Sequence, residues 1–265
     1  MIKNYRNVAT PISFYGQSPN SVGGGASFSP LDVAGLAAWF KADSLSLSDG
    51  DPVSTWNDSS GNSRDATGGG GSANPIFKTN VINGLPIVRF DNGDYFTHPT
   101  LTNSGSSIFF VISGSSAMTG NDGIYSWTDG GDDYSGGNTL TYGTGYAGGP
   151  PSGFSGIWRG IGTWFTNVTT AFDAFFSYNV IISDAGSGDI TMTTRKSETT
   201  LETKTAAGLL SNSPSNCFIG ARGSGASAGA PFYRGDFAEL IIYNVDIGVT
   251  DRDKVELYLK TKYNL

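Results

Sequence analysis

The stretch Pro30-Leu-Asp-Val-Ala-Gly-Leu-Ala-Ala-Trp-Phe-Lys-Ala-Asp43 decides the fold, together with a second stretch near the other end, Arg234-Gly-Asp-Phe-Ala-Glu-Leu-Ile-Ile-Tyr-Asn244. Residues 37–41 of the first and residues 237–243 of the second are apolar runs of strand length. We interpret them as the opening and closing strands of one β-sandwich. If they pair, residues 30–265 form one domain whose ends lie together.

The composition agrees with an all-β protein. The chain has 265 residues, 38 of them glycine, and only 15% are charged, which is typical of many short strands joined by tight turns. Aromatic residues make up 12%, more than disordered chains contain. All-β domains often exceed 200 residues, so one domain can account for this length.

Charge and cysteine content exclude several classes of function. The net charge of -7 argues against binding to nucleic acid or to an anionic membrane surface, since both need a basic surface. There is no apolar run of about 20 residues for membrane insertion, and the first residues lack the apolar stretch of a secretory signal. The single cysteine, Cys217, cannot form an internal disulfide, and we interpret it as a buried apolar residue.

Residues 1–29 differ from the rest of the chain. They contain few apolar residues and the run Val22-Gly-Gly-Gly-Ala-Ser27, which indicates an extended arm followed by a flexible linker. We expect Tyr5, Phe14 and Tyr15 to anchor this arm on a larger particle. The alternative, a disordered tail, stays open.

The remaining signals place the secondary structure. Ser29 and Pro30 are typical of the start of a short helix, after which we expect Trp39 to point into the sandwich. Asn83-Gly84 predicts a hairpin. A C-terminal helix should begin at Thr250–Asp253 and pack on the rim of the sandwich. Further strands are expected at residues 86–90, 107–113 (central), 172–182, 190–194 and 217–221.

In this order the pieces resemble the LamG-like jelly-roll domains of the concanavalin A-like lectin/glucanase superfamily, as found in phage virion surface proteins. The resemblance covers residues 30–265, with 115–175 poorly matched, and implies a two-sheet antiparallel β-sandwich. That superfamily includes adhesins, enzymes and structural proteins, so the fold does not decide the function. The matching segments are Leu36–Asp43, Val53–Asn62, Ala66-Thr67, Pro75, Asn83–Asp91, Phe218–Ala221, Gly235–Asn244 and Val255–Tyr263.

Glycan hydrolysis needs two carboxylates that flank one bond. The chain has only four glutamates, Glu198, Glu202, Glu239 and Glu256, and they form no alternating acidic triplet. The Glu-x-Asp-x-x-Glu pattern of the glucanases of this fold is absent. The only histidine, His98, has no Ser or Cys motif near it, and we expect it in a loop. We therefore predict that the protein is not an enzyme.

One metal site is conceivable. A single His and a single Cys exclude zinc. Calcium prefers oxygen ligands, which Asp129, Asp132 and Asp133 could supply between flexible glycines. A solvated acidic loop without metal is the alternative. Asp91–Asp94 is better explained as a turn.

Glycan binding needs flat aromatic faces beside polar groups. The loop-rich region 120–165 contains candidates for such faces, and packing within the core is the alternative for each. We predict a site there composed of Trp127, Tyr134, Tyr142, Tyr146 and Trp158.

These inferences lead to one expected function and two alternatives. We expect a non-enzymatic structural or adhesive protein on a bacteriophage particle (head fibre, decoration or tail-associated component), extracellular after release and homo-oligomeric. Residues 1–29 would contact capsid or tail proteins, and the sandwich could contact a host surface glycan. The first alternative is a carbohydrate-binding module for a cell-surface polysaccharide, and the second is a glycan-degrading enzyme of the same fold.

Overall fold

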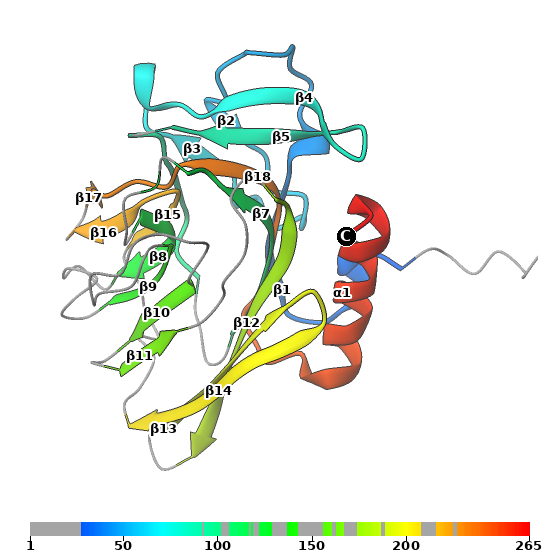
Figure 1. Cartoon of the computed structure of the whole chain (residues 1–265), viewed down its shortest axis with the longest axis vertical. Helices are drawn as coiled ribbons and strands as arrows, with labels where there is room; N and C mark the ends of the chain where they lie inside the picture. Colours follow the sequence, from blue (N-terminus) through cyan, green and yellow to red (C-terminus); the bar gives the residue numbers. More distant parts are fainter. Residues whose placement is uncertain are drawn as a thin grey trace, which may run out of the picture.

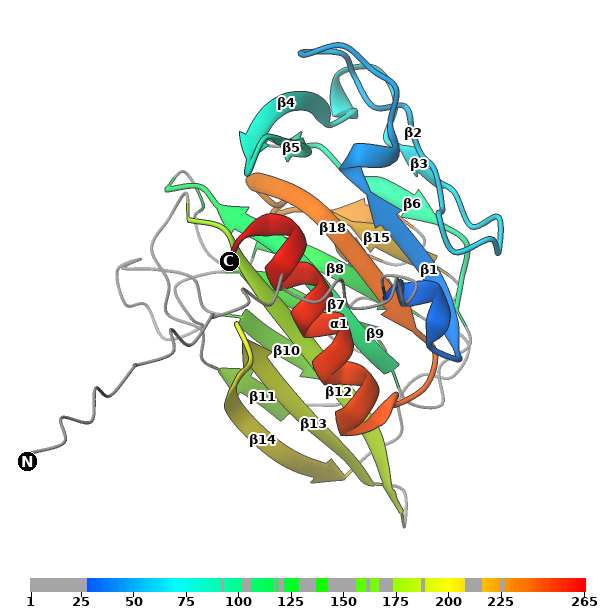
Figure 2. The ribbon, with the colours of Figure 1, turned by 90° about the vertical axis from the view of Figure 1, so that its right-hand side faces the viewer.

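The structure is a computed structural model, and it describes residues 28–91, 93–101, 106–116, 118, 122–128, 137–142, 156–160, 163–166, 174–186, 189–207, 216–224 and 227–265. Two antiparallel sheets pack face to face, and one α-helix lies on the outer side of the first sheet (Figure 1; Figure 2). The β-sandwich that the sequence predicts is therefore confirmed.

The first sheet has eight strands among the described residues, with β7 and β18 at its centre. The order is β14-β13-β12-β7-β18-β5-β4, and β1 pairs with β18 beside β5. The strands are β1 (Leu36–Lys41), β4 (Ile76–Ile82), β5 (Leu85–Phe90), β7 (Ser106–Gly114), β12 (Phe176–Gly186), β13 (Asp189–Lys196), β14 (Thr199–Ala207) and β18 (Gly235–Tyr243).

The second sheet also has eight described strands, in the order β11-β10-β9-β8-β15-β6-β3-β2. A separate two-stranded ribbon joins β16 (Arg222–Ser224) to β17 (Ser227–Gly229). The strands of the second sheet are β2 (Thr55–Trp56), β3 (Ala66–Gly68), β6 (Phe96–His98), β8 (Asp122–Thr128), β9 (Gly137–Tyr142), β10 (Gly156–Gly160), β11 (Thr163–Thr166) and β15 (Asn216–Ile219).

The two stretches that decide the fold pair as predicted. β1 runs antiparallel to β18, with Trp39 opposite Ile241 and Phe40 opposite Leu240. Asn83 and Gly84 form the expected hairpin turn between β4 and β5, and both have the positive φ that such a turn requires. Ser29 caps a 3-10 helix, Pro30–Asp32, which is shorter than the helix of one or two turns expected there. Two further 3-10 helices lie at Ala42–Ser44 and Gly71–Ala73.

The α-helix α1 (Gly248–Tyr263) changes how the first sheet is buried. It lies across the outer face of the sheet, over β18 and its neighbours (Figure 2), where the sequence predicts contact with the rim. Val255, Leu259 and Tyr263 are buried against the sheet. All nine residues of β18 are consequently buried, whereas its alternating sequence suggests one solvent face. Thr250 and Asp253 lie inside the helix, whose N-cap is Ile247.

The molecule thus has two apolar layers, one between the sheets and one between the first sheet and α1, and Trp39 lies in the second. The layer between the sheets contains Phe40, Trp56 and Phe110. Trp39, which we expected there, belongs to the layer between the first sheet and α1. Its neighbour Phe40 takes the inner position because successive strand residues point to opposite faces.

A buried carboxylate on the sheet accepts hydrogen bonds from α1. Glu239 on β18 has no exposed surface. Its Oε1 accepts from Trp39 Nε1 at 2.6 Å and from the Tyr258 hydroxyl at 3.0 Å. Its Oε2 accepts from Lys262 Nζ and the Tyr263 hydroxyl, both at 2.8 Å. Burial and this carboxylate raise the pKa of both tyrosines far above the usual value. Two of the four glutamates are thus buried between α1 and the sheet: Glu239 on the sheet and Glu256 on the helix.

Glu256 makes the second link, from the helix side. Its carboxylate accepts from Arg195 Nε at 2.6 Å, from Arg195 Nη2 at 3.0 Å and from Asn179 Nδ2 at 2.6 Å. Arg195 lies on β13 and Asn179 on β12. The helix is therefore fixed to three strands of the sheet by hydrogen-bonded charges.

Candidate functional site

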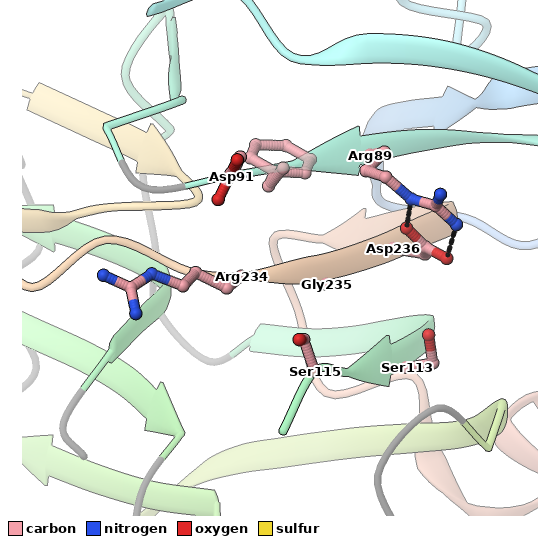
Figure 3. Close-up of a pocket in the computed structure, with 8 residues that line it drawn as sticks. Arg89, Asp91, Ser113, Ser115, Arg234, Gly235 and Asp236 are labelled. Atoms are coloured by element: carbon pink, nitrogen blue, oxygen red, sulfur yellow. Dashed lines mark hydrogen bonds and ion pairs between the residues drawn. The ribbon is translucent and has the colours of Figure 1, made fainter. Parts of the chain in front are cut away.

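A polar cleft of about 340 Å³ opens where β5, β7 and β18 meet at one end of the first sheet (Figure 3). We call it the end cleft. Its lining comes from all three strands and from residues just beyond their ends. The lining residues are Arg89, Phe90, Asp91, Ser113, Ser115, Arg234, Gly235 and Asp236.

Strand register brings the polar residues of the end cleft together. Asp236 on β18 lies opposite Arg89 on β5 and opposite Ser113 on β7. The next residue, Phe237, lies opposite Val88 and points into the core between the sheets. Because side chains alternate along a strand, the polar row lies on the opposite, outer face.

An ion pair forms one wall of the end cleft. Arg89 Nε and Nη2 donate to the two carboxylate oxygens of Asp236 at 2.8 and 2.9 Å, a bidentate geometry. The Arg89 side chain is 48% exposed, whereas that of Asp236 is only 10% exposed. The buried Asp236 carboxylate thus orients the Arg89 side chain, whose planar guanidinium faces solvent.

The other walls add hydroxyl and charged groups. In Figure 3 the hydroxyls of Ser113 and Ser115 point toward β18, while Arg234 extends away from the Arg89–Asp236 pair. Asp91 directly follows β5. The two arginines and two aspartates of the lining balance in formal charge. The end cleft therefore suits a neutral ligand rich in hydroxyl groups better than a strongly charged one.

Gly235 lets β7 and β18 approach closely at the floor of the end cleft. A Cβ at this position would lie 2.1 Å from the Ser113 carbonyl oxygen and 2.8 Å from the Tyr233 hydroxyl. The Tyr233 hydroxyl donates to that same carbonyl at 2.6 Å. Any larger residue would push the strands apart, so the glycine is needed for the shape of the cleft.

A second hollow, of about 390 Å³, runs along the outside of α1. Phe28, Leu257 and Tyr258 provide much of its lining, which is mainly apolar. Phe28 and Tyr258 are in edge-to-face contact, with ring centroids 6.3 Å apart. Phe28, assigned from the sequence to the arm, thus contacts α1. The end cleft, in contrast, combines charged and hydroxyl groups from three strands.

The predicted glycan site is corrected at one residue. Trp127 is on β8, 1% exposed, and its ring packs in the core 5.4 Å from that of Tyr125. Its side chain therefore cannot stack on a sugar. Tyr142 is the last residue of β9, and Trp158 lies on β10 opposite Leu140. Tyr134 and Tyr146 lie outside the described residues.

The predicted metal and anchor residues also lie outside the described part of the chain: Asp129, Asp132 and Asp133 for calcium, and Tyr5, Phe14 and Tyr15 for the particle anchor. Within the described ranges, no three His, Cys, Asp or Glu side chains are grouped so as to hold a metal ion. Asp91 and Asp94 close a turn, as expected. The Asp94 carboxylate accepts from Asp91 N at 2.6 Å, and burial raises its pKa.

His98 and Cys217 are neighbours in the core. His98 lies on β6, not in a loop, and is opposite Cys217 on β15. Burial lowers the pKa of His98 to about 4 and raises that of Cys217 to about 12. The histidine is 3.2 Å from the Tyr125 hydroxyl and stacks on that ring. Both groups are neutral near pH 7, as packing residues should be.

No described helix is long and apolar enough to cross a bilayer.

No protein-family model and no curated protein sequence matches the chain. Solved structures do resemble it. Domain 4 of AbnA, an extracellular arabinanase of family GH43 from Geobacillus stearothermophilus, was solved with arabinotriose. It matches at a TM-score of 0.58 and 13% identity, over 85% of this chain and 98% of that one.

Two further structures match part of a longer chain. Trypanosoma rangeli sialidase has a TM-score of 0.56 at 14% identity, covering 96% of this chain and 36% of the sialidase. The receptor-binding domain of the botulinum neurotoxin C/D mosaic serotype has a TM-score of 0.55 at 10% identity, covering 86% of this chain and 51% of that one. These likenesses show a β-sandwich fold and no more. The narrower resemblance to LamG-like domains of phage stays a prediction.

We did not predict the end cleft from the sequence, although the sequence contains a signal for it. Arg89, Ser113 and Asp236 are polar residues beside apolar runs near one end of their strands. A polar residue in an apolar strand often marks a place where a face opens to solvent. Only the pairing of three distant strands shows that these three positions are adjacent.

Proposed function

We propose that the protein is a non-enzymatic glycan-binding β-sandwich and that the end cleft holds a neutral sugar unit. The observation that carries this proposal is the row Arg89–Asp236–Ser113 in the lining of the end cleft, where Arg89 presents its guanidinium to solvent above the buried Asp236 and Ser113. The structural neighbours give it support of a general kind. One was solved with arabinotriose, and another is a sialidase.

The chemistry of the end cleft fits sugar hydroxyls. Each hydroxyl can donate one hydrogen bond and accept two, so it needs both kinds of partner close by. The Arg89 guanidinium donates, and the serine hydroxyls do both. At about 340 Å³ the cleft lies at the small end of the usual range for ligand sites, so we expect one or two sugar units.

Binding without hydrolysis follows from the role of the Asp236 carboxylate. Both of its oxygens accept hydrogen bonds from Arg89, so the carboxylate is occupied within an ion pair. Hydrolysis needs two carboxylates that are free to flank the same bond. We therefore expect no release of reducing sugar from any glycan that the protein binds.

The experiment is a glycan array followed by calorimetric titration of the strongest binder. Arg89→Gln removes the guanidinium, and Lys78→Gln is the matched control at the Lys78–Asp49 surface ion pair, 2.6 Å long. We expect Arg89→Gln to weaken binding about tenfold or more, and Lys78→Gln to leave it within about twofold. Equal effects of the two variants, or sugar release by the wild type, would contradict the proposal.

Trp158→Ala provides a test of the remaining part of the aromatic site. If binding is lost in Trp158→Ala and kept in Arg89→Gln, the glycan binds at the predicted aromatic residues and not in the end cleft. A role on a phage particle, with residues 1–29 docked on capsid or tail proteins, stays a separate prediction.

A further inference from the structure

The strand β14 ends the first sheet, and its outer edge is the feature from which we argue. Among the described residues its only strand partner is β13, with which it pairs along its length from Lys196–Thr199 to Asp189–Ala207. Figures 1 and 2 show it at the margin of the sheet, away from β18. An end strand offers a row of backbone donors and acceptors to another chain.

The composition of β14 favours pairing. Its sequence, Thr-Thr-Leu-Glu-Thr-Lys-Thr-Ala-Ala, has four threonines and neither proline nor glycine, the residues that commonly protect edge strands or weaken them. Thr205 and Thr203 bond to Thr191 and Thr193 of β13 through their hydroxyls, at 2.9 and 3.1 Å. The register of β14 against β13 shifts at Leu201, which is 36% exposed. The threonine pairs therefore keep the part of β14 around Thr203 and Thr205 in regular register, and Leu201 beside it presents an apolar side chain to solvent.

We propose that a second copy of this chain pairs with β14, antiparallel and about a two-fold axis at Thr203. This pairing is self-complementary in charge. With Thr203 opposite the partner's Thr203, Glu202 lies opposite the partner's Lys204, and Lys204 lies opposite the partner's Glu202. Leu201 lies opposite the partner's Thr205, which covers part of its exposed surface.

Charge selects this register over its neighbours. Within one chain Lys204 Nζ and Glu202 Oε1 are 2.6 Å apart, with side chains 37% and 19% exposed, so both charges stand on one face beside the edge. The two-fold axis at Thr203 joins two such pairs into an alternating group of four charges. An axis at Glu202 or at Lys204 would place like charges directly opposite each other, which is destabilising. The dimer would therefore form a continuous sheet with one defined register.

Reversal of single charges tests this pairing on the full chain, with mass measured by sedimentation across a range of concentrations. Wild-type protein should be a dimer. Lys204→Glu and Glu202→Lys each place like charges opposite each other in both symmetry-related pairs, so each should weaken dimerisation about tenfold or more. The double variant Glu202→Lys/Lys204→Glu restores opposite charges and should dimerise as the wild type does.

A mixture of the two single variants provides the sharpest outcome. Lys204→Glu protein carries two acidic residues on β14 and Glu202→Lys protein carries two basic ones, so the mixture should form a one-to-one dimer while each alone does not. Circular dichroism confirms that each variant is folded. As matched controls, Lys78→Glu and Asp49→Lys reverse a distant surface pair and should leave the dimer intact. A monomeric wild type, or single variants that dimerise as strongly as wild type, would overturn the proposal.

Discussion

The substitution Glu239→Gln tests whether the buried carboxylate fixes α1 to the sheet. Each carboxylate oxygen accepts two hydrogen bonds, one pair from Trp39 and Tyr258 and the other from Lys262 and Tyr263. Glutamine has the same shape, but its amide nitrogen cannot accept. Whichever way the amide turns, two of the four hydrogen bonds to a charged oxygen are lost and the charge that held Lys262 disappears.

The expected cost follows from these contacts. A hydrogen bond to a charged group contributes about 1.5–3 kcal/mol, so two of them amount to about 3–6 kcal/mol. Loss of one partner from a buried ion pair typically costs about 3–5 kcal/mol, which agrees. Asp43, 3.1 Å from Lys262, keeps part of the interaction, so we expect about 3–5 kcal/mol. For a domain of this size that corresponds to a fall in Tm of about 6–20 °C.

The assay is equilibrium unfolding in urea, followed by far-UV circular dichroism. The control is Glu198→Gln, which removes the same charge from an exposed ion pair between Glu198 and Lys260. Surface pairs contribute about 0–1 kcal/mol, so the control should change little. If Glu239→Gln also loses less than about 1 kcal/mol, the carboxylate does not fix the helix and our interpretation of this layer is wrong.

Three further predictions concern the core and the arm. The pKa of His98 is about 4 in the folded protein and about 6.5 when unfolded, so protonation favours unfolding as pH falls from about 6.5 to 4, at a total cost of about 3 kcal/mol. His98→Gln should remove that part of the pH dependence of unfolding; parallel curves for both proteins would refute it. Cys217, 1% exposed, should react with a thiol reagent only after denaturation; rapid reaction of native protein would contradict its burial. Deletion of residues 1–27, which keeps the contact of Phe28 with α1, should leave Tm nearly unchanged, and aggregation or a large fall in Tm would show that these residues belong to the folded domain.

Local sequence patterns were sufficient for the elements that local chemistry controls. The hairpin at Asn83-Gly84 depends on two residues with positive φ, and asparagine and glycine are those that adopt it most readily. The pairing of β1 with β18 followed from two apolar segments at opposite ends of the chain. The hairpin could be predicted because its signal lies within a few adjacent residues, and the β1–β18 pairing is the one long-range contact for which two apolar runs of strand length were enough.

What depends on contacts between distant segments could not be predicted. Trp39 and Phe40 are both large and apolar, so alternation alone does not say which faces the other sheet, and α1 decides it by covering Trp39. Trp127 begins a glycine-rich stretch of the region 120–165, which suggested a loop, yet β8 carries it into the core. The end cleft needs three strands far apart in sequence, and its register is not encoded locally.

The placement of α1 has a consequence for synthesis on the ribosome. The helix α1 follows every described strand in the chain and supplies Lys262, Tyr258 and Tyr263 for Glu239, and Glu256 for Arg195. Because folding during synthesis proceeds from the N-terminus onward, the first sheet carries Glu239 and Arg195 without these partners on an apolar outer surface until α1 docks. A truncated product that lacks α1 would therefore expose the kind of surface that chaperones and proteases recognise.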